Sequence, residues 1–434
     1  MAFSALLVIF LLFLTKTIDA QTLYPTSAGG VGAVYTMTNA LDMNQVIIYR
    51  LNATGQLTYV NTVNTNGTGM NATVTDPLFS QGSMTVYSNY LFVVNAGSNS
   101  LSMFMINTSD ATQLTLLSIK LVYGLFPVSV TANYLYACVL TDGNSTGIRC
   151  FTYNSSGLFI VPWFDRIVTQ STTQNVPPNS FGGTMSKILF SADNMALIVA
   201  YQGYSSQQPG NVFLYPLSSN STVLGLNQTQ VYSAQLIQPS SITLVDTNGL
   251  LVTDPGASGI LTMFYSSIIN TGGAIYNSKL TSINSTLSGS LCSSTYSSKI
   301  GNYYVIGRAG VTTSIVELNL NWNNLNPVTV VQYYSLPKNT GAFEATVVNL
   351  AGTDYLYVLG TMAQTIRGYQ LNAAGNATAN GISIVQQGYT AVGIATFVQT
   401  SSLSSASSTV STLALAITIM FCLMSIVFCS QRNE

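Results

Sequence analysis

The stretch NYLFVVNAGSNSLSMFMI, residues 89–106, contains two short runs of β-branched and aromatic residues on either side of a Gly-containing loop. This pattern is typical of a β-hairpin. The same layout recurs at intervals of roughly 50 residues, a period typical of repeat architectures. The six further copies are residues 34–51, 134–153, 196–217, 250–265, 303–320 and 355–371.

Each hairpin is flanked by further alternating runs, such as FPVSVTA (126–132) before the third hairpin and QLTLLSIK (113–120) after the second. Four strands per unit predict an all-β, seven-bladed β-propeller spanning residues 21–399. A pair of β-sandwiches is the alternative, and seven similarly ordered units favour the propeller. One aligned position supports packing between units, because it holds Tyr49, Phe104, Phe151, Tyr215, Met263, Leu318 and Tyr369.

The two ends of the propeller are expected to pair with each other. The first hairpin lacks a convincing strand before it, and the last unit is followed by an extra run, AVGIATFV (391–398). That run can supply the missing innermost strand of the first blade, which would close the ring and hide its edges.

The opening stretch, together with FSADNMALIVAY (190–201), resembles the lactonase-type seven-bladed propellers, which include 6-phosphogluconolactonase and carboxymuconate-cyclising relatives. Enzymatic members of this group use His, Arg and Glu at the central channel. The chain contains no histidine, so the resemblance implies the fold but an incomplete catalytic set. Asp193 and Asp246 match turn acids of such blades and are interpreted as structural.

The chain ends predict secretion and membrane attachment. Residues 1–20 read as a signal peptide, with an N-terminal membrane anchor as the alternative. Residues 400–412 form a Ser/Thr-rich stalk, residues 413–429 are apolar, and residues 430–434 form a short polar tail. The apolar segment is either a transmembrane helix or a GPI-attachment signal. We therefore expect a cell-surface, single-pass type I protein, or alternatively a GPI-anchored one.

Only 6% of residues are charged, with 12 Lys and Arg against 13 Asp and Glu. So little positive charge disfavours a nucleic-acid partner. Hydrated sugar could replace the missing surface charge. N-glycosylation is predicted at the ten Asn-x-Ser/Thr sites, Asn52, Asn66, Asn71, Asn107, Asn144, Asn154, Asn220, Asn227, Asn284 and Asn376.

Five cysteines fit an oxidising compartment. Cys138 and Cys150 flank the loop of the third hairpin and are predicted to form a disulfide across its two strands. Cys292 is left over and is expected to be a buried free thiol, while Cys422 and Cys429 lie in the apolar C-terminal segment.

Charged residues predicted to gather at one end of the propeller channel form the candidate binding site. In a four-stranded blade, the hairpin loop, the connection between blades and the start of the innermost strand share one face. The residues expected there are Glu344, Arg308, Asp254, Arg149 and Arg367. Anchoring of loops is the alternative role for these charges. Lys187 either faces the channel or lies between blades.

No Gly-rich phosphate loop, Cys/His metal cluster or nucleophile elbow is present in the sequence, so we predict no cofactor, no metal and no catalytic residue. The first functional hypothesis is a membrane-anchored, glycosylated, monomeric propeller that binds an unknown extracellular ligand or protein. The second is an extracellular lactonase-like hydrolase or cyclase, which the absence of histidine disfavours.

Overall fold

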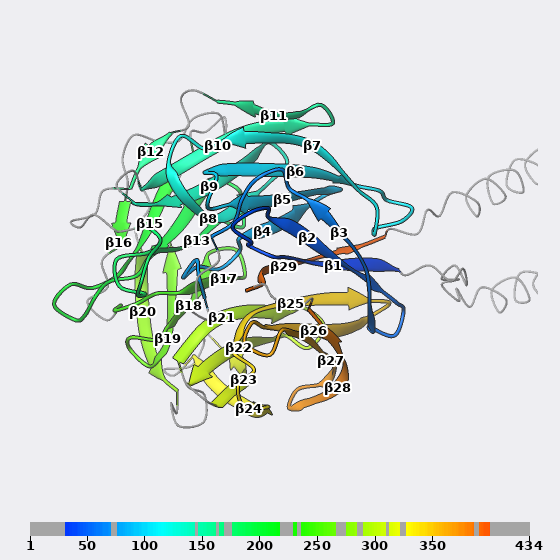
Figure 1. The fold of residues 1–434 in the computed structure, drawn as a ribbon. Coiled ribbons are helices and arrows are strands. Elements are labelled where there is room, and N and C mark those ends of the chain that lie inside the picture. Colours follow the sequence, from blue (N-terminus) through cyan, green and yellow to red (C-terminus); the bar gives the residue numbers. More distant parts are fainter. Residues whose placement is uncertain are drawn as a thin grey trace, which may run out of the picture. The chain divides into compact units, whose positions relative to one another are not determined.

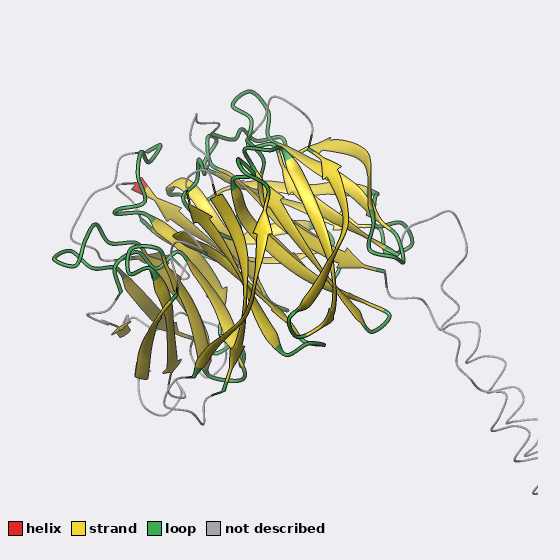
Figure 2. Cartoon of the chain, turned by 90° about the horizontal axis from the view of Figure 1, so that it is seen from below, coloured by secondary structure: helices red, strands yellow, loops and turns green. Residues whose placement is uncertain are grey.

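The computed structural model describes residues 31–70, 76–143, 146–161, 165–168, 176–217, 229–231, 236–265, 275–283, 290–309, 312–321, 327–385 and 390–399. The chain divides into a compact unit, Met1–Val398, and a second unit, Gln399–Glu434. All strands of the described residues lie in the first unit. Figure 2 shows that this unit is built almost wholly of strands and the loops between them.

The strands form seven separate antiparallel sheets, which confirms the predicted seven-bladed β-propeller. Blade 1 consists of β29 (Val392–Val398), β1 (Gly32–Met37), β2 (Gln45–Leu51) and β3 (Leu57–Asn64). Blade 2 consists of β4 (Met84–Tyr87), β5 (Tyr90–Asn95), β6 (Ser100–Ile106) and β7 (Leu114–Leu121). Blade 3 consists of β8 (Leu125–Ala132), β9 (Tyr136–Asp142), β10 (Gly147–Asn154) and β11 (Gly157–Ile160), and β12 (Arg166–Ile167) also pairs with β10.

The other four blades follow the same order, from the innermost to the outermost strand. Blade 4 consists of β13 (Met185–Phe190), β14 (Ala196–Tyr201), β15 (Asn211–Pro216) and β16 (Thr229–Val231). Blade 5 consists of β17 (Ser241–Val245), β18 (Gly249–Asp254), β19 (Gly259–Tyr265) and β20 (Ile275–Ser282). Blade 6 consists of β21 (Ser290–Ser297), β22 (Asn302–Ala309), β23 (Thr312–Leu320) and β24 (Val328–Leu336). Blade 7 consists of β25 (Ala342–Leu350), β26 (Thr353–Gly360), β27 (Thr365–Ala373) and β28 (Asn376–Ile384).

The ring is closed by the last strand, as the sequence predicted. β29 pairs with β1 in antiparallel register, with Gly32 opposite Val398 and Tyr35 opposite Ala395. The innermost strands β29, β4, β8, β13, β17, β21 and β25 contact one another in this order, and β25 contacts β29. Figure 1 shows the seven sheets around a common centre, with β29 beside β1.

Apolar side chains fill the space between neighbouring blades. The aligned position predicted for packing is buried in six blades, and only its blade 7 member, Tyr369, is half-buried. Tyrosine hydroxyls add bonds between blades: Tyr35 donates to the Ala111 carbonyl at 2.6 Å, and Tyr357 donates to the Gly55 carbonyl at 2.5 Å. A buried hydroxyl without a partner would be costly, so these bonds fix how blades 7, 1 and 2 meet.

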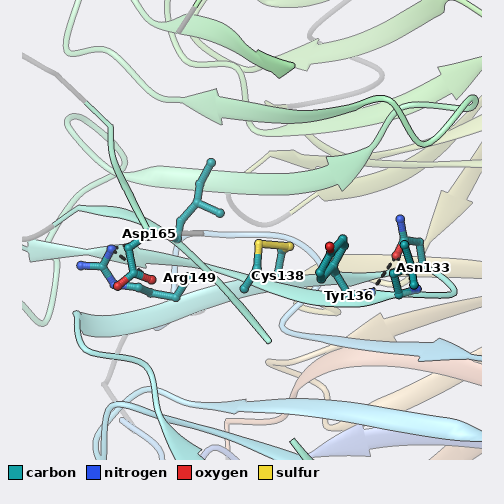
Figure 3. The surroundings of a disulfide bond; sticks show 8 residues. Asn133, Tyr136, Cys138, Arg149 and Asp165 are labelled. Atoms are coloured by element: carbon teal, nitrogen blue, oxygen red, sulfur yellow. Dashed lines mark hydrogen bonds and ion pairs between the residues drawn. A yellow bond between two sulfur atoms is a disulfide. The ribbon is translucent and has the colours of Figure 1, made fainter. Parts of the chain in front are cut away.

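Cys138 and Cys150 lie directly opposite each other on β9 and β10 and form a disulfide, shown in Figure 3. Both side chains are buried. Cys292 lies on the innermost strand of blade 6, where it is buried and forms no disulfide.

The predicted signal peptide, stalk, C-terminal apolar segment and tail lie outside the described residues. Among the residues that are described, no helix combines the length and the apolar character needed to cross a membrane.

Peptide mapping under non-reducing conditions should find Cys138 joined to Cys150, with Cys292 alkylated only after unfolding. Reduction should lower the free energy of unfolding by about 2–3 kcal/mol, because the closed loop is short. A Cys292→Ala variant is the matched control and should keep the same disulfide. A bridge from Cys292 to either partner would contradict the strand pairing of blade 3.

Candidate functional site

A cavity of about 450 Å³ occupies the centre of the ring. Its wall takes residues from the innermost strand of every blade, among them Val86, Val130, Leu244 and Ala345. This volume is within the range of sites that hold small ligands. The innermost strands all start at the same face and run in the same direction, so equivalent positions on different blades form levels along the cavity.

One level of the wall carries five threonines at equivalent positions. In each blade, one residue of the second strand pairs with the aligned packing position of the third strand, and the threonine lies opposite the residue that follows it. Examples are Thr85 opposite Phe92 and Thr346 opposite Tyr357. We call this level the threonine girdle, and it comprises Thr85, Thr131, Thr243, Thr295 and Thr346. Leu189 and Ala395 hold the equivalent positions in blades 4 and 1.

The girdle presents hydroxyl groups with unused hydrogen-bonding capacity. All five threonines are half-buried and line the cavity. Thr243 bonds to Ser294 of the next blade at 2.6 Å. The other four hydroxyls have no hydrogen-bond partner among the described residues. They are therefore available to a ligand or to solvent.

Among the described residues, the cavity wall has only two charged residues, Lys187 and Glu344, and both belong to the level two residues earlier. Residues two apart on a strand point to the same side, so both side chains belong to the channel face. The equivalent positions of the other blades hold only small residues, Ser83, Ser129, Ser241, Ser293 and Gly393. Lys187 and Glu344 lie on blades 4 and 7, which are separated by two blades on one side of the ring and three on the other.

Glu344 is almost fully buried, and its Oε1 accepts a hydrogen bond from the Gly82 N–H at 2.5 Å. Burial raises the pKa of Glu344 above its usual value, and the N–H groups of Gly82 and Gly393 and the charge of Lys187 oppose this shift. The second oxygen, Oε2, is buried without a hydrogen-bond partner among the described residues. The described residues therefore satisfy the carboxyl group only in part.

The Lys187 side chain is half-buried and lines the cavity. Burial lowers the pKa of its amine, and the negative charge of Glu344 acts in the opposite direction. No hydrogen bond or ion pair joins Lys187 to any other described residue. Its amine is thus a donor available to a ligand or to solvent in the cavity.

One end of the cavity is covered by residues 76–82 of the connection between blades 1 and 2, a segment we call the strap. Gln81 crosses the ring, because its N–H donates to Ser186 O at 2.7 Å and its Nε2 donates to Phe343 O at 3.3 Å. These two acceptors immediately precede Lys187 and Glu344 in the chain. The strap thereby holds the two charged residues at a fixed separation.

Further contacts fix the strap to blades 3 and 4. Ser80 donates to Val128 O at 2.8 Å, and Gln202 donates to Phe79 O at 2.7 Å. The Phe79 ring packs edge-on against Phe181, with 4.8 Å between ring centroids. Bonds to several blades at once make the strap a structural part of the ring rather than a free loop.

The five residues predicted to form a charged channel mouth take different places. Glu344 is the one that lines the cavity. Asp254 is fully buried, and its carboxylate accepts hydrogen bonds from the N–H groups of Ile237, Gln238 and Ala257 at 2.7–2.9 Å. Burial raises its pKa, and these N–H donors oppose the shift. Asp254 thus anchors loops, the alternative role considered for these charges.

Arg149 lies on β10 of blade 3, and its side chain lies next to Asp165, as Figure 3 shows. Its guanidinium donates to Tyr123 O at 3.1 Å and lies 3.6 Å from an oxygen of Asp165. Asp165 is 44% exposed, so this ion pair contributes little to stability.

Arg367 occupies the same register as Arg149, since each is the third residue of its strand. It is half-buried on β27, and its Nε has no hydrogen-bond partner among the described residues. Arg308 was expected in a hairpin loop, whereas its backbone belongs to β22, opposite Ser290. Strand pairing in blade 6 extends further than the sequence pattern indicated, and the Arg308 side chain lies outside the described residues.

The threonine girdle is a feature of the cavity wall that the sequence did not lead us to predict. Its signal was visible in the innermost runs SMTVY, VSVTA, SITLV and FEATV, each of which carries a threonine two residues after a Ser or Glu. Lys187 was assigned to either the channel or the space between blades, and it lines the channel. No group of three or more His, Cys, Asp or Glu residues suited to a metal ion occurs among the described residues.

Comparisons with solved structures find the same architecture in bacterial proteins. A putative 6-phosphogluconolactonase from Bacteroides fragilis matches with a TM-score of 0.62 and 12% identity, covering 86% of this chain and 100% of that chain. The fold is that of the lactonase-like seven-bladed propellers. The periplasmic gluconolactonase of Pseudomonas aeruginosa matches with a TM-score of 0.62 and 12% identity, covering 85% of this chain and 99% of that chain. No protein-family model matches the sequence, and no curated protein matches it significantly.

Competitive acetylation over a pH series should show that Lys187 becomes reactive at a lower pH than a lysine in a short unstructured peptide, because burial lowers the pKa of Lys187. Replacing Glu344 with Gln removes the negative charge that raises this pKa, so E344Q should lower the pKa of Lys187 further. A Lys187 that titrates like the lysine of the peptide would contradict the buried site.

Proposed function

We propose that this lactonase-like propeller binds a small hydroxylated carboxylate in its central cavity, at the outer surface of a cell membrane. Lys187 would hold the carboxylate, and the threonine girdle would bond to the hydroxyl groups. Glu344 would contribute its second oxygen, as an acceptor when ionised or as a donor when protonated. The proposal concerns the interior of the ring rather than a charged surface at its mouth.

The observation that carries this proposal is the unused bonding capacity of the cavity wall. Among the described residues, Lys187 has no hydrogen-bond partner and Glu344 Oε2 has none, and both residues belong to the same level of the cavity wall. A buried polar atom left unsatisfied costs free energy, and a ligand that pairs with it recovers that cost on binding. Charged and hydroxyl groups that lack hydrogen-bond partners and are held in place by a rigid scaffold favour binding of a polar ligand.

The proposed location rests on the sequence of the two chain ends, with the disulfide as a supporting observation, since disulfides persist in oxidising compartments. Residues 413–429 would attach the protein to the membrane as a transmembrane helix, with the GPI signal as the alternative. Release of the propeller from intact cells by a phosphatidylinositol-specific phospholipase would contradict the helix and establish the lipid anchor.

A second candidate function is hydrolysis of a lactone in the same cavity. Its supporting observation is the opposite pKa shifts, upward for Glu344 and downward for Lys187, which make both groups better suited to proton transfer near neutral pH. Water would attack the lactone carbonyl, and ionised Glu344 would take a proton from this water. Protonated Lys187 would stabilise the resulting oxyanion. The ring C–O bond would then break, and the proton would pass to the leaving alkoxide.

Thermal-shift and calorimetric titrations with D-gluconate, glycerate and tartrate should show binding of at least one of these hydroxylated carboxylates. Lys187→Met should abolish it, and Lys120→Met, on the exposed outer strand β7, should not. Binding should weaken as pH rises through the lowered pKa of Lys187, because the neutral amine no longer attracts a carboxylate. Failure of the whole series, or binding that survives Lys187→Met, would contradict the proposal.

Incubation with glucono-1,5-lactone, followed by the release of acid, tests the second candidate. If hydrolysis occurs in the cavity, Glu344→Gln should reduce the rate by about 10² or more, since it removes the proton-transfer group. Thr346→Val, two residues further along the same strand, is the matched control and should alter KM more than kcat. Hydrolysis no faster than in buffer would exclude this candidate and leave the binding function.

A further inference from the structure

The turns between the third and fourth strands of four blades share one sequence feature. These turns begin at or directly after Asn52, Asn107 and Asn154 in blades 1, 2 and 3, and the turn of blade 7 ends directly before Asn376, the first residue of β28. Each of these asparagines belongs to an Asn-x-Ser/Thr site. The four blades are consecutive in the ring, because β29 of blade 1 contacts both β25 of blade 7 and β4 of blade 2, and β4 contacts β8 of blade 3.

All four turns lie on the same face of the propeller. Strands alternate in direction within a blade, so the turn from the third to the fourth strand shares a face with the turn from the first to the second. The connections between blades, including the strap, lie on the other face. The outer position of the third and fourth strands places the four asparagines along the rim of the ring.

Three of these asparagines have the same local conformation. The side-chain oxygen accepts a hydrogen bond from the backbone N–H two residues later, with distances of 3.0 Å at Asn52, 2.8 Å at Asn107 and 2.7 Å at Asn154. The donors Thr54, Ser109 and Ser156 are the hydroxyl residues of the same sites. This turn engages the oxygen of the amide and leaves its nitrogen, the atom that receives a glycan, without a protein partner.

Exposure agrees with this arrangement. Asn107, Asn154 and Asn376 are exposed and Asn52 is half-buried. The remaining site among the described residues, Asn66, is exposed on the connection between blades 1 and 2, so it belongs to the opposite face. At this site the Thr68 N–H donates to Ser98 Oγ at 3.0 Å and not to the Asn66 side chain.

We propose that Asn52, Asn107, Asn154 and Asn376 carry N-linked glycans that form a continuous arc along one rim of the propeller. The inference rests on the proposed extracellular location and goes beyond it by specifying which sites are modified and on which face. The arc would shield blades 7, 1, 2 and 3 on that face.

The test is to express the full chain in a secretory eukaryotic host and release N-glycans enzymatically in H₂¹⁸O. Mass spectrometry should find all four asparagines converted to ¹⁸O-labelled aspartate. On gel electrophoresis, the apparent mass should fall by one glycan in each of four single variants, Thr54→Val, Ser109→Ala, Ser156→Ala and Thr378→Val. Thr58→Val, an exposed threonine outside any site, should leave the number of steps unchanged.

A second arm separates failure of the inference from failure of the proposed location. Residues 1–20 are exchanged for a signal peptide of known efficiency, so that entry into the secretory pathway no longer depends on this sequence. Glycans on the four turns only after this exchange would contradict the proposed location and support the arc. The proposed arc would be overturned if the four turns stayed unmodified in a chain that is glycosylated elsewhere. It would also be overturned if the chain entered the secretory pathway and carried no glycan.

Discussion

The pairing of β29 with β1 is the constraint on which the rest of the structure depends. Without it blade 1 would have only three strands, and β1 would expose an unpaired edge. The cavity also needs this closure, because Ile394, Ala395 and Thr396 of β29 form part of its wall. One contact between the two ends of the propeller thus creates the seventh wall of the cavity.

The architecture was predictable because its signals are local. A hairpin is recognised from two β-rich runs and a turn, and seven copies leave little choice of topology. Cys138 and Cys150 could be paired on the same basis, since hairpin geometry places them opposite each other. The extra run at residues 391–398 could be assigned because one blade lacked a strand. In each case a short segment and its neighbours contained the necessary information.

The site could be predicted only in part, because it depends on which side of each innermost strand faces the channel. Glu344 was found since a lone acid on an apolar strand is conspicuous. Asp254 and Arg149 are equally conspicuous, yet backbone N–H groups and Asp165 satisfy them away from the cavity. A charged residue in a loop does not reveal whether the loop itself satisfies the charge. The threonines of the girdle were missed individually, because a threonine on a strand is unremarkable until seven strands are aligned.

The register of β1 and β29 also has a mechanical consequence. Gly32 lies opposite Val398, so the chain enters and leaves the propeller at adjacent points of one sheet. Tension applied between these two points would pull the two strands apart from one end. Their hydrogen bonds would therefore break one after another and would not share the force. Blade 1 would therefore yield first under force. The strands of the other six blades are joined by turns of the chain, so these blades would bear no force until blade 1 had opened.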